Sequence, residues 1–250
     1  MKIAVAGGTG VVGQHVVSLA REQGHEVVSL SRRTGVDVKS RDGLTKALQG
    51  VDSIVDVTNS TSLSKKGATA FFTTVTGNLH AAGHEAGAQH LVVLSIVGLE
   101  RAAMYGYYAA KLAQEAAATS GPLPTSLVRA TQFHQFPAQV MSKARFAGFA
   151  VVPHVPVKTV SARAVAAVLL EVALQPPRTS TLEISGPEVA DLADLSRALA
   201  PRQPRKTRVL SFRLPGRVGK AVRAGALLPS NDARIVGPTF DSWLSSMPTT

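Results

Sequence analysis

Residues 3–13 read IAVAGGTGVVG, a short apolar run followed by four glycines within seven residues. Apolar residues then recur at one-face helical spacing, which predicts a strand, a glycine turn and a helix. In that context Gly7 and Gly10 leave the backbone open to a pyrophosphate, and Gly13 lets the helix pack close to the strand. A turn that merely joins two elements is the alternative. The predicted dinucleotide-binding turn comprises Gly7, Thr9, Gly10, Val11, Val12 and Gly13.

The rest of the first half alternates strand-like and helix-like segments. Strands are predicted at 26–30, 36–38, 53–57, 91–94 and 126–129, and helices at 43–49, 67–87 and 105–119. Continuously apolar strands that alternate with helices indicate an α/β fold, with a doubly wound parallel sheet covered on both faces.

After about Thr131 this regularity weakens, because prolines interrupt the pattern. A helix at 162–174 and a strand at 181–184 are still predicted, followed by short helices joined by loops. We therefore expect a dinucleotide-binding core at residues 1–131. Residues 132–250 should form a smaller C-terminal substrate-covering lobe that returns elements to the sheet within one structural unit.

Composition narrows the class of protein. The 250 residues include 27 Lys and Arg, 16 Asp and Glu and no Cys, so the net charge is +11 and thiolate chemistry is excluded. Eight cations and no acid lie between Arg202 and Arg223, a stretch typical of a solvated face or of a loop that meets an anionic ligand. Nucleic acid is disfavoured, since Phe212 is the one aromatic residue there for base stacking. No metal site, membrane span or export signal is predicted, which leaves a cytoplasmic protein with a small-molecule substrate.

Cofactor choice is indicated at the end of the second strand. An acidic residue about 20 positions beyond the glycines would favour NAD, whose adenosine ribose has a free 2′-hydroxyl. The chain has Ser31, Arg32 and Arg33 there instead. Guanidinium groups can hold a 2′-phosphate through charge-assisted bonds. This favours NADP (NADPH) over NAD, the alternative being that both arginines are ordinary solvated residues.

A candidate catalytic trio follows. Tyr107 and Lys111 lie four residues apart on a predicted helix, so they share a face. Ser95 ends a predicted strand at the sheet edge where such folds bind ligands. We expect Lys111 to favour the Tyr107 phenolate, Tyr107 to exchange a proton with the substrate oxygen, and Ser95 to hydrogen-bond that oxygen. Surface residues at this spacing are the alternative.

Together these motifs resemble the short-chain dehydrogenase/reductase superfamily, specifically its atypical NmrA-like NAD(P)-binding branch. The resemblance is based on three features: the motif Gly7-Gly8-Thr9-Gly10-x-x-Gly13, the motif Tyr107-x-x-x-Lys111 with Ser95 twelve residues before Tyr107, and the segment 128–134. The resemblance, over residues 1 to 190, implies a Rossmann-type fold with Asp37 near the adenine, Thr58 and Asn59 near the ribose, and Lys111 reaching the nicotinamide ribose. The Asn of the better-known enzymes has no counterpart that we can assign.

Two functions remain open at this stage. The first is an NADP-dependent oxidoreductase that transfers hydride to or from a carbonyl or hydroxyl group of a small organic substrate. The second is a non-catalytic NADP(H)-binding redox sensor or regulator of the NmrA-like type. Retention of Ser95, Tyr107 and Lys111 favours the enzyme.

Overall fold

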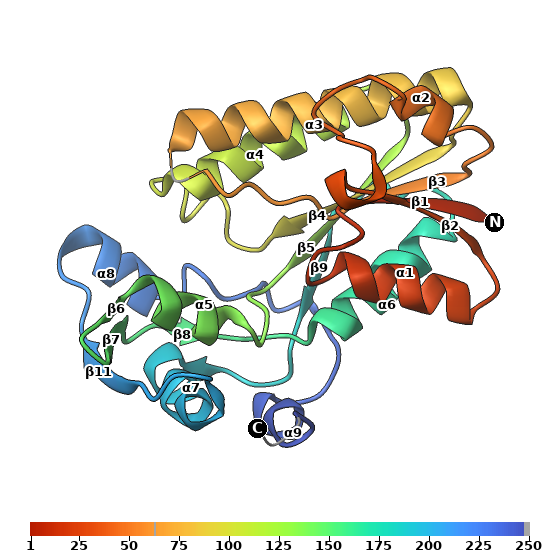
Figure 1. The fold of residues 1–250 in the computed structure, drawn as a ribbon. Helices are drawn as coiled ribbons and strands as arrows, with labels where there is room; N and C mark the ends of the chain where they lie inside the picture. The colour runs from red at the N-terminus through yellow and green to blue at the C-terminus, as the bar shows by residue number, and fades with distance from the viewer. Residues whose placement is uncertain (63, 248–250) are drawn as a thin grey trace. The chain divides into compact units, whose positions relative to one another are not determined.

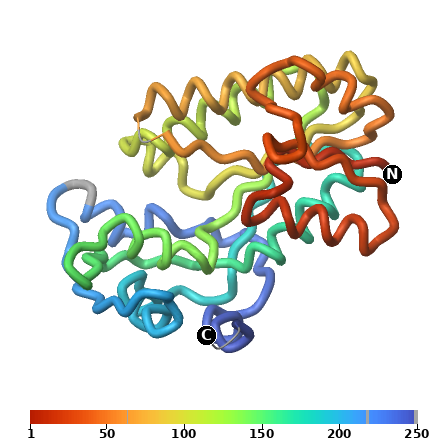
Figure 2. Tube along the Cα trace, in the orientation of Figure 1, coloured from red at the N-terminus to blue at the C-terminus, as the bar shows by residue number. Residues whose placement is uncertain are grey.

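The computed structural model describes residues 1–62 and 64–247. The chain divides into two compact units. Unit 1 comprises Met1–Arg129 and Ala162–Leu182, and unit 2 comprises Ala130–Ser161 and Glu183–Thr250. The segment that starts at Ala162 therefore returns to the first unit, and its helix runs beside the first helix of the chain (Figure 2).

Unit 1 contains five strands in the order β2-β1-β3-β4-β5, of which β2, β1, β3 and β4 pair in parallel. Ile3 to Ala6 in β1 and the whole of β3 are buried, as expected for strands covered on both faces. The first connection leads to one side of β1 and the second to the other side, so the order reverses at β1, where open α/β sheets bind ligands. The strands are β1 (Lys2–Ala6), β2 (Glu26–Leu30), β3 (Ser53–Asp56), β4 (His90–Ile96) and β5 (Thr125–Ala130).

Helices cover both faces of this sheet. Two long helices pack on each other over one face, and another pair packs over the opposite face (Figure 1). The first pair is α3 (Lys65–Ala86) with α4 (Gly106–Thr119), and the second is α1 (Gly13–Glu22) with α6 (Ala162–Ala173). A 3₁₀ turn, η1 (Arg32–Thr34), and a short helix, α2 (Leu44–Ala47), complete the unit. The doubly wound prediction is confirmed.

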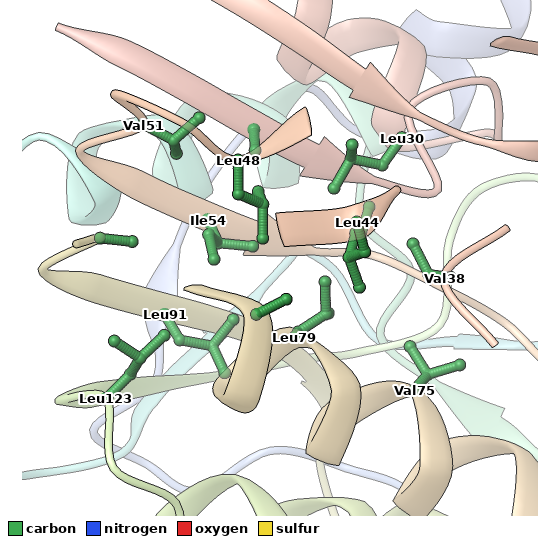
Figure 3. Close-up of a cluster of buried hydrophobic side chains, with 14 of the residues drawn as sticks. Leu30, Val38, Leu44, Leu48, Val51, Ile54, Val75, Leu79, Leu91 and Leu123 are labelled. Carbon is green, nitrogen blue, oxygen red and sulfur yellow. The ribbon is translucent and has the colours of Figure 1, made fainter. Parts of the chain in front are cut away.

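The core under α3 holds leucine, valine and isoleucine side chains from the strands and from α2 and α3 (Figure 3). Leu30, Leu44, Leu48, Ile54 and Leu79 have no exposed surface. Each such side chain contributes about 1.5–3 kcal/mol when it leaves water. This packing fixes the strand ends that carry the candidate site.

Unit 2 contains smaller elements. Its three-stranded sheet has the order β11-β7-β6, and two further pairs join β8 with β10 and β9 with β12. The strands are β6 (Arg145–Phe146), β7 (Phe149–Pro153), β8 (Pro156–Val157), β9 (Leu182–Ser185), β10 (Ala190–Asp191), β11 (Arg208–Phe212) and β12 (Arg234–Ile235). The helices are α5 (Phe136–Lys143), α7 (Leu192–Leu199), η2 (Ala200–Arg202), α8 (Gly216–Arg223) and α9 (Phe240–Ser245).

One predicted strand is wrong. Residues 36–38 form a turn, in which the Asp37 carboxylate accepts from the Lys39 amide at 3.0 Å. Asn78 on α3 donates to the carbonyls of Val38 and Lys39, at 3.1 and 2.9 Å. Side chains thus satisfy backbone groups that a strand would have paired, while Val38 is buried in the core.

Across the described residues, none of the helices combines the length and the apolar character needed to cross a membrane.

Candidate active site

The glycine turn closes tightly between β1 and α1. Gly7 has a φ of +81°, and a Cβ there would lie 3.0 Å from the Val57 carbonyl oxygen. A Cβ on Gly13 would lie 2.2 Å from the Gly7 carbonyl oxygen, well inside van der Waals contact. Both positions therefore require glycine. The start of α1 has no side-chain cap at Val12. The amides of Gln14 and His15 donate to the carbonyls of Gly10 and Val12, so among the described residues the Val12 and Gly13 amides are the ones available to a phosphate.

The other predicted loop residues divide by exposure. Thr9 is half-buried, Gly10 is exposed, and the Val11 side chain is 42% exposed. The Val12 side chain is buried in the core, so this residue can offer a ligand only its backbone.

The predicted cofactor segments meet at one sheet edge. The Gly7 amide donates to the Leu30 carbonyl at 2.9 Å, next to Ser31, and the Val57 amide donates to the Ala6 carbonyl at 3.0 Å. The glycine turn consequently touches the ends of both β2 and β3. A dinucleotide lying along the turn would have residues 31–33 on one side and Thr58 on the other.

The segment after β2 is a small ordered turn. The Thr34 hydroxyl donates to the Ser29 carbonyl at 2.6 Å and accepts from the Ser31 amide at 3.0 Å. Arg32 and Arg33 are exposed within η1, and within residues 1–62 and 64–247 neither has an acidic partner. Asp37 is exposed a few residues further on. Arg32 and Arg33 therefore lie just after Leu30, whose carbonyl accepts from the Gly7 amide, and their role toward a cofactor stays a prediction.

Tyr107 and Asn59 are in direct contact. The Tyr107 hydroxyl donates to Asn59 Oδ1 at 2.7 Å, which joins the first turn of α4 to the loop after β3. The Tyr107 ring packs edge-on against Phe72 of α3, with 5.9 Å between the ring centroids. A second edge-on contact joins its ring to that of Tyr108, with 6.4 Å between the centroids. The sequence did not indicate the contacts with Asn59 and Phe72.

Lys111 is buried and held by different partners. Its ammonium donates to the Leu94 carbonyl at 2.7 Å and to Gln114 Oε1, and it lies 4.7 Å from the centre of the Phe72 ring. Gln114 Nε2 donates to Asp56 Oδ2 at 3.0 Å. Phe72 thus contacts both predicted catalytic residues on α4, and Asp56 shares their neighbourhood through Gln114.

Ser95 is the next residue after Leu94 on β4. Its hydroxyl is buried, and within the part of the chain that the structure describes it has no hydrogen-bond partner. Among the described residues the buried hydroxyls of Thr76 and Thr131 are also unpaired, and Ser95 differs from them in lying next to the carbonyl that Lys111 binds. Because Lys111 bonds the preceding carbonyl, these two predicted catalytic residues lie together.

The acid–base properties differ from the expectation in one respect. Burial raises the pKa of Tyr107 to about 12, and the neighbouring Tyr108 adds to the rise. Burial lowers the pKa of Lys111 to about 8, while the charges of Asp56 and Glu115 act in the opposite direction. The predicted depression of the Tyr107 pKa by Lys111 is therefore absent from the described structure: the phenol is a proton donor at neutral pH, not a phenolate.

Sequence reasoning missed Asp56, Gln114 and Phe72. Asp56 is a fully buried acid at the end of an apolar strand, which is an unusual position and a usable signal. Gln114 lies three residues after Lys111, at helix-neighbour spacing, but no pattern in the sequence marks it out. Phe72 was indistinguishable from an ordinary core residue.

His134 has a local structural role. Its ring is buried and forms hydrogen bonds with the Thr159 hydroxyl at 2.9 Å and the Pro238 carbonyl at 3.3 Å. The ring also packs edge-on against Phe240 and in a tilted arrangement against Trp243. Burial lowers its pKa to about 4, so it is neutral at physiological pH. The structure thus favours packing within unit 2 over the substrate contact that the sequence left open.

The comparisons with known proteins agree with this geometry. The model of the NAD dependent epimerase/dehydratase family matches residues 3–130, half of the chain. The chain belongs to this family. A search of curated proteins finds no match. The narrower NmrA-like assignment stays a prediction.

Solved structures of similar fold include three with identities of 16–17%. UDP-N-acetylglucosamine 4-epimerase from Bacillus cereus has 17% identity and a TM-score of 0.70, with 98% of this chain and 94% of that chain covered. A short-chain dehydrogenase/reductase superfamily protein from Agrobacterium tumefaciens with bound NAD gives 17% and 0.70, with 98% and 95% covered. The triphenylmethane reductase of Citrobacter sp. complexed with NADP(H) gives 16% and 0.69, with 99% and 100% covered. These likenesses establish the fold.

A nicotinamide dinucleotide fits the residues present. In a member of the epimerase/dehydratase family the cofactor's phosphates need a backbone cradle, and the turn at Gly7 and Gly13 has no room for a Cβ at either position. Family membership and this cradle support a dinucleotide-dependent enzyme of the oxidoreductase or epimerase type.

Proposed function

We propose that this protein is an NADP(H)-dependent oxidoreductase that transfers hydride to or from a carbonyl or hydroxyl group of a small organic substrate. The unpaired, buried hydroxyl of Ser95 carries the proposal. It is a hydrogen-bonding group without a partner in the described structure, and it lies at the carboxyl edge of the sheet beside the residue that anchors Lys111. A substrate oxygen is a suitable partner for it.

Dinucleotide binding is assigned to the turn and the two strand ends beside it. The amides of Val12 and Gly13 at the start of α1 would hold the pyrophosphate, and Thr58 and Asn59 would lie toward the ribose. Arg32 and Arg33 support NADP over NAD, because exposed guanidinium groups attract a 2′-phosphate that an acid would repel. The adenine would lie toward Asp37. The bound nicotinamide supplies or accepts the hydride.

Tyr107 is the proposed proton donor. With a pKa raised to about 12, its hydroxyl is almost entirely protonated at pH 7, so it can donate to a substrate oxygen but seldom accepts a proton from one. A substrate oxygen would replace Asn59 Oδ1 as the acceptor of this hydrogen bond. In the reductive direction a carbonyl oxygen would gain the Tyr107 proton, and the reverse reaction would return a proton to Tyr107.

Lys111 supplies positive charge near the developing phenolate. It lies one helical turn from Tyr107, both contact Phe72, and its pKa of about 8 keeps most of the ammonium charged at pH 7. A cation in a dry environment stabilises nearby negative charge more than it would in water. We assign Lys111 to this role and to the nicotinamide ribose.

The test is NADPH consumption across a panel of carbonyl compounds, with wild type and Tyr107→Phe compared. The matched control is Tyr105→Phe, which removes a hydroxyl from a more exposed tyrosine two residues away. We expect Tyr107→Phe to lose at least about a hundredfold in kcat/KM with NADPH affinity retained, as is typical when a general acid is removed. Equal rates for Tyr107→Phe and wild type would refute the assignment, and NADPH binding without turnover on any compound would favour the redox sensor.

A further inference from the structure

Lys111 has a set of partners that the mechanism above does not use. Its ammonium donates to Gln114 Oε1, and Gln114 Nε2 donates to Asp56 Oδ2 at 3.0 Å. A primary amide offers an acceptor on one side and a donor on the other, so it can join an ammonium to a carboxylate without adding charge. Gln114 is oriented to do this between α4 and the end of β3.

All three groups are removed from water. The exposed fractions are 3% for Lys111, 1% for Gln114 and 0% for Asp56. An isolated buried ion loses several kcal/mol of hydration, which an opposite charge and hydrogen bonds must offset. The charge on each end of the bridge therefore depends on the charge at the other end.

Other charged groups near Lys111 are occupied elsewhere. Glu115, on the same helix, binds Arg129 of β5 through both carboxylate oxygens, at 2.9 and 2.6 Å. Arg129 also pairs with Glu100 at 2.7 Å. His80 on α3 is neutral at pH 7, since burial lowers its pKa. The charge of Glu115 also raises the Lys111 pKa, but Asp56 is the acid that a hydrogen-bonded bridge joins to Lys111.

Asp56 is held on its other side by the loop that carries Asn59. Its Oδ1 accepts from the Thr58 amide at 2.9 Å and from the Thr58 hydroxyl at 2.6 Å. Asn59 in turn accepts from Tyr107. Hydrogen bonds therefore lead from Lys111 through Gln114 and Asp56 to the loop at residues 58–59. Tyr107, on the same helix α4 as Lys111, contacts the other end of that loop.

We propose that Asp56 and Gln114 are positioning residues, which keep the Lys111 ammonium charged and fixed against the Leu94 carbonyl. One part of this inference rests on the proposed function, namely that the Lys111 charge assists Tyr107 and the cofactor. The effect on Lys111 itself is independent of it, because it follows from a buried cation, a bridging amide and a buried anion in the free protein.

The experiment is an NMR titration of lysine side chains labelled with ¹³C and ¹⁵N in the free protein. The Lys111 signal is identified by its loss in Lys111→Arg. Asp56→Asn removes the anion, and Gln114→Met removes the bridge at similar side-chain volume. Asp52→Asn is the matched control, since it makes the same change just before β3, where Asp52 accepts from the Lys2 amide.

We expect the acid dissociation constant of Lys111 to rise about tenfold in Asp56→Asn, because a nearby opposite charge shifts a pKa by about one to three units and this one acts through an amide. Gln114→Met should shift it in the same direction, and Asp52→Asn should leave it unchanged. If Asp56→Asn does not fold, Gln114→Met decides. A Lys111 pKa equal to that of wild type in each folded variant would overturn the inference.

A second readout links the bridge to function. NADPH affinity of the same variants is measured between pH 7 and pH 9. As the pH rises, Gln114→Met should lose NADPH affinity at a lower pH than wild type, because its Lys111 loses the proton earlier. If wild type binds no NADPH, the proposed function fails, while the Lys111 titration still confirms or refutes the bridge. A bridge that served only to hold α4 against β3 would change the stability of the fold without moving the Lys111 titration.

Discussion

Gly13→Ala tests the glycine turn. The new Cβ would lie 2.2 Å from the Gly7 carbonyl oxygen and 2.8 Å from Gly8 Cα, whereas ordinary contact begins at 3.4 Å. The overlap with the oxygen exceeds 1 Å, and both neighbours are backbone atoms of a turn already fixed by a positive φ at Gly7. Overpacking of this kind costs about 1–3 kcal/mol or somewhat more, so we expect about 3 kcal/mol of lost stability in urea unfolding. The opened turn should also weaken NADPH binding at least about tenfold.

Gly77→Ala is the matched control. Gly77 is exposed on α3, and a Cβ there would meet nothing within 4 Å. Replacing glycine in an open helical position stabilises a helix by about 0.5–1 kcal/mol. The same substitution should therefore have opposite effects at the two sites. A Gly13→Ala protein as stable as wild type, with unchanged NADPH affinity, would refute the reasoning about the turn.

Three further predictions follow from named contacts. Arg32→Ala and Arg33→Ala should each weaken NADPH binding about fivefold and leave NADH binding unchanged, since an exposed ionic contact contributes at most about 1 kcal/mol. The control Arg21→Ala should change the affinity for neither cofactor. Calorimetric titration measures these affinities, and a preference of the wild type for NADH would contradict the prediction. Phe72→Ala should cost about 3–5 kcal/mol in urea unfolding, because its fully buried ring packs against Tyr107 and Lys111, and a loss below about 1 kcal/mol would contradict the packing. Folding lowers the Lys111 pKa from its ordinary value of 10.5 to about 8, because the side chain is buried. Between these two values the unfolded chain binds the extra proton, so stability rises with pH. Relative to Lys111→Met, wild type should gain about 2 kcal/mol from pH 8 to pH 10, and a difference that is flat over this range would contradict the burial of the charge.

Much of unit 1 could be predicted from the sequence, because its signals are local. The apolar run before Gly7 and the helical spacing after it fixed β1 and α1, and the bounds of β2 at Glu26–Leu30 agree with the prediction. The segment 36–38 failed because a short apolar run cannot be distinguished from a buried turn. Its stabilising partner, Asn78, lies 40 residues away in the chain.

The site was predictable where a motif specifies a backbone shape, and not where side chains meet across elements. The glycine turn and the arginines after β2 are contiguous patterns. The contacts of Tyr107 with Asn59 and of Gln114 with Asp56 join residues 48 and 58 positions apart, and only the packing of α4 on the sheet brings them together. Burial also set the pKa of Tyr107 opposite to the expectation drawn from its spacing to Lys111.

Hydride transfer from NADPH deuterated at the nicotinamide C4 tests the central proposal most directly. Mass spectrometry of products from a panel of carbonyl compounds would follow the label. We predict a product with one deuterium on the former carbonyl carbon, formed by wild type and by Tyr105→Phe and at least about a hundredfold more slowly by Tyr107→Phe. NADPH bound by wild type with no deuterium transferred to any compound would contradict the account.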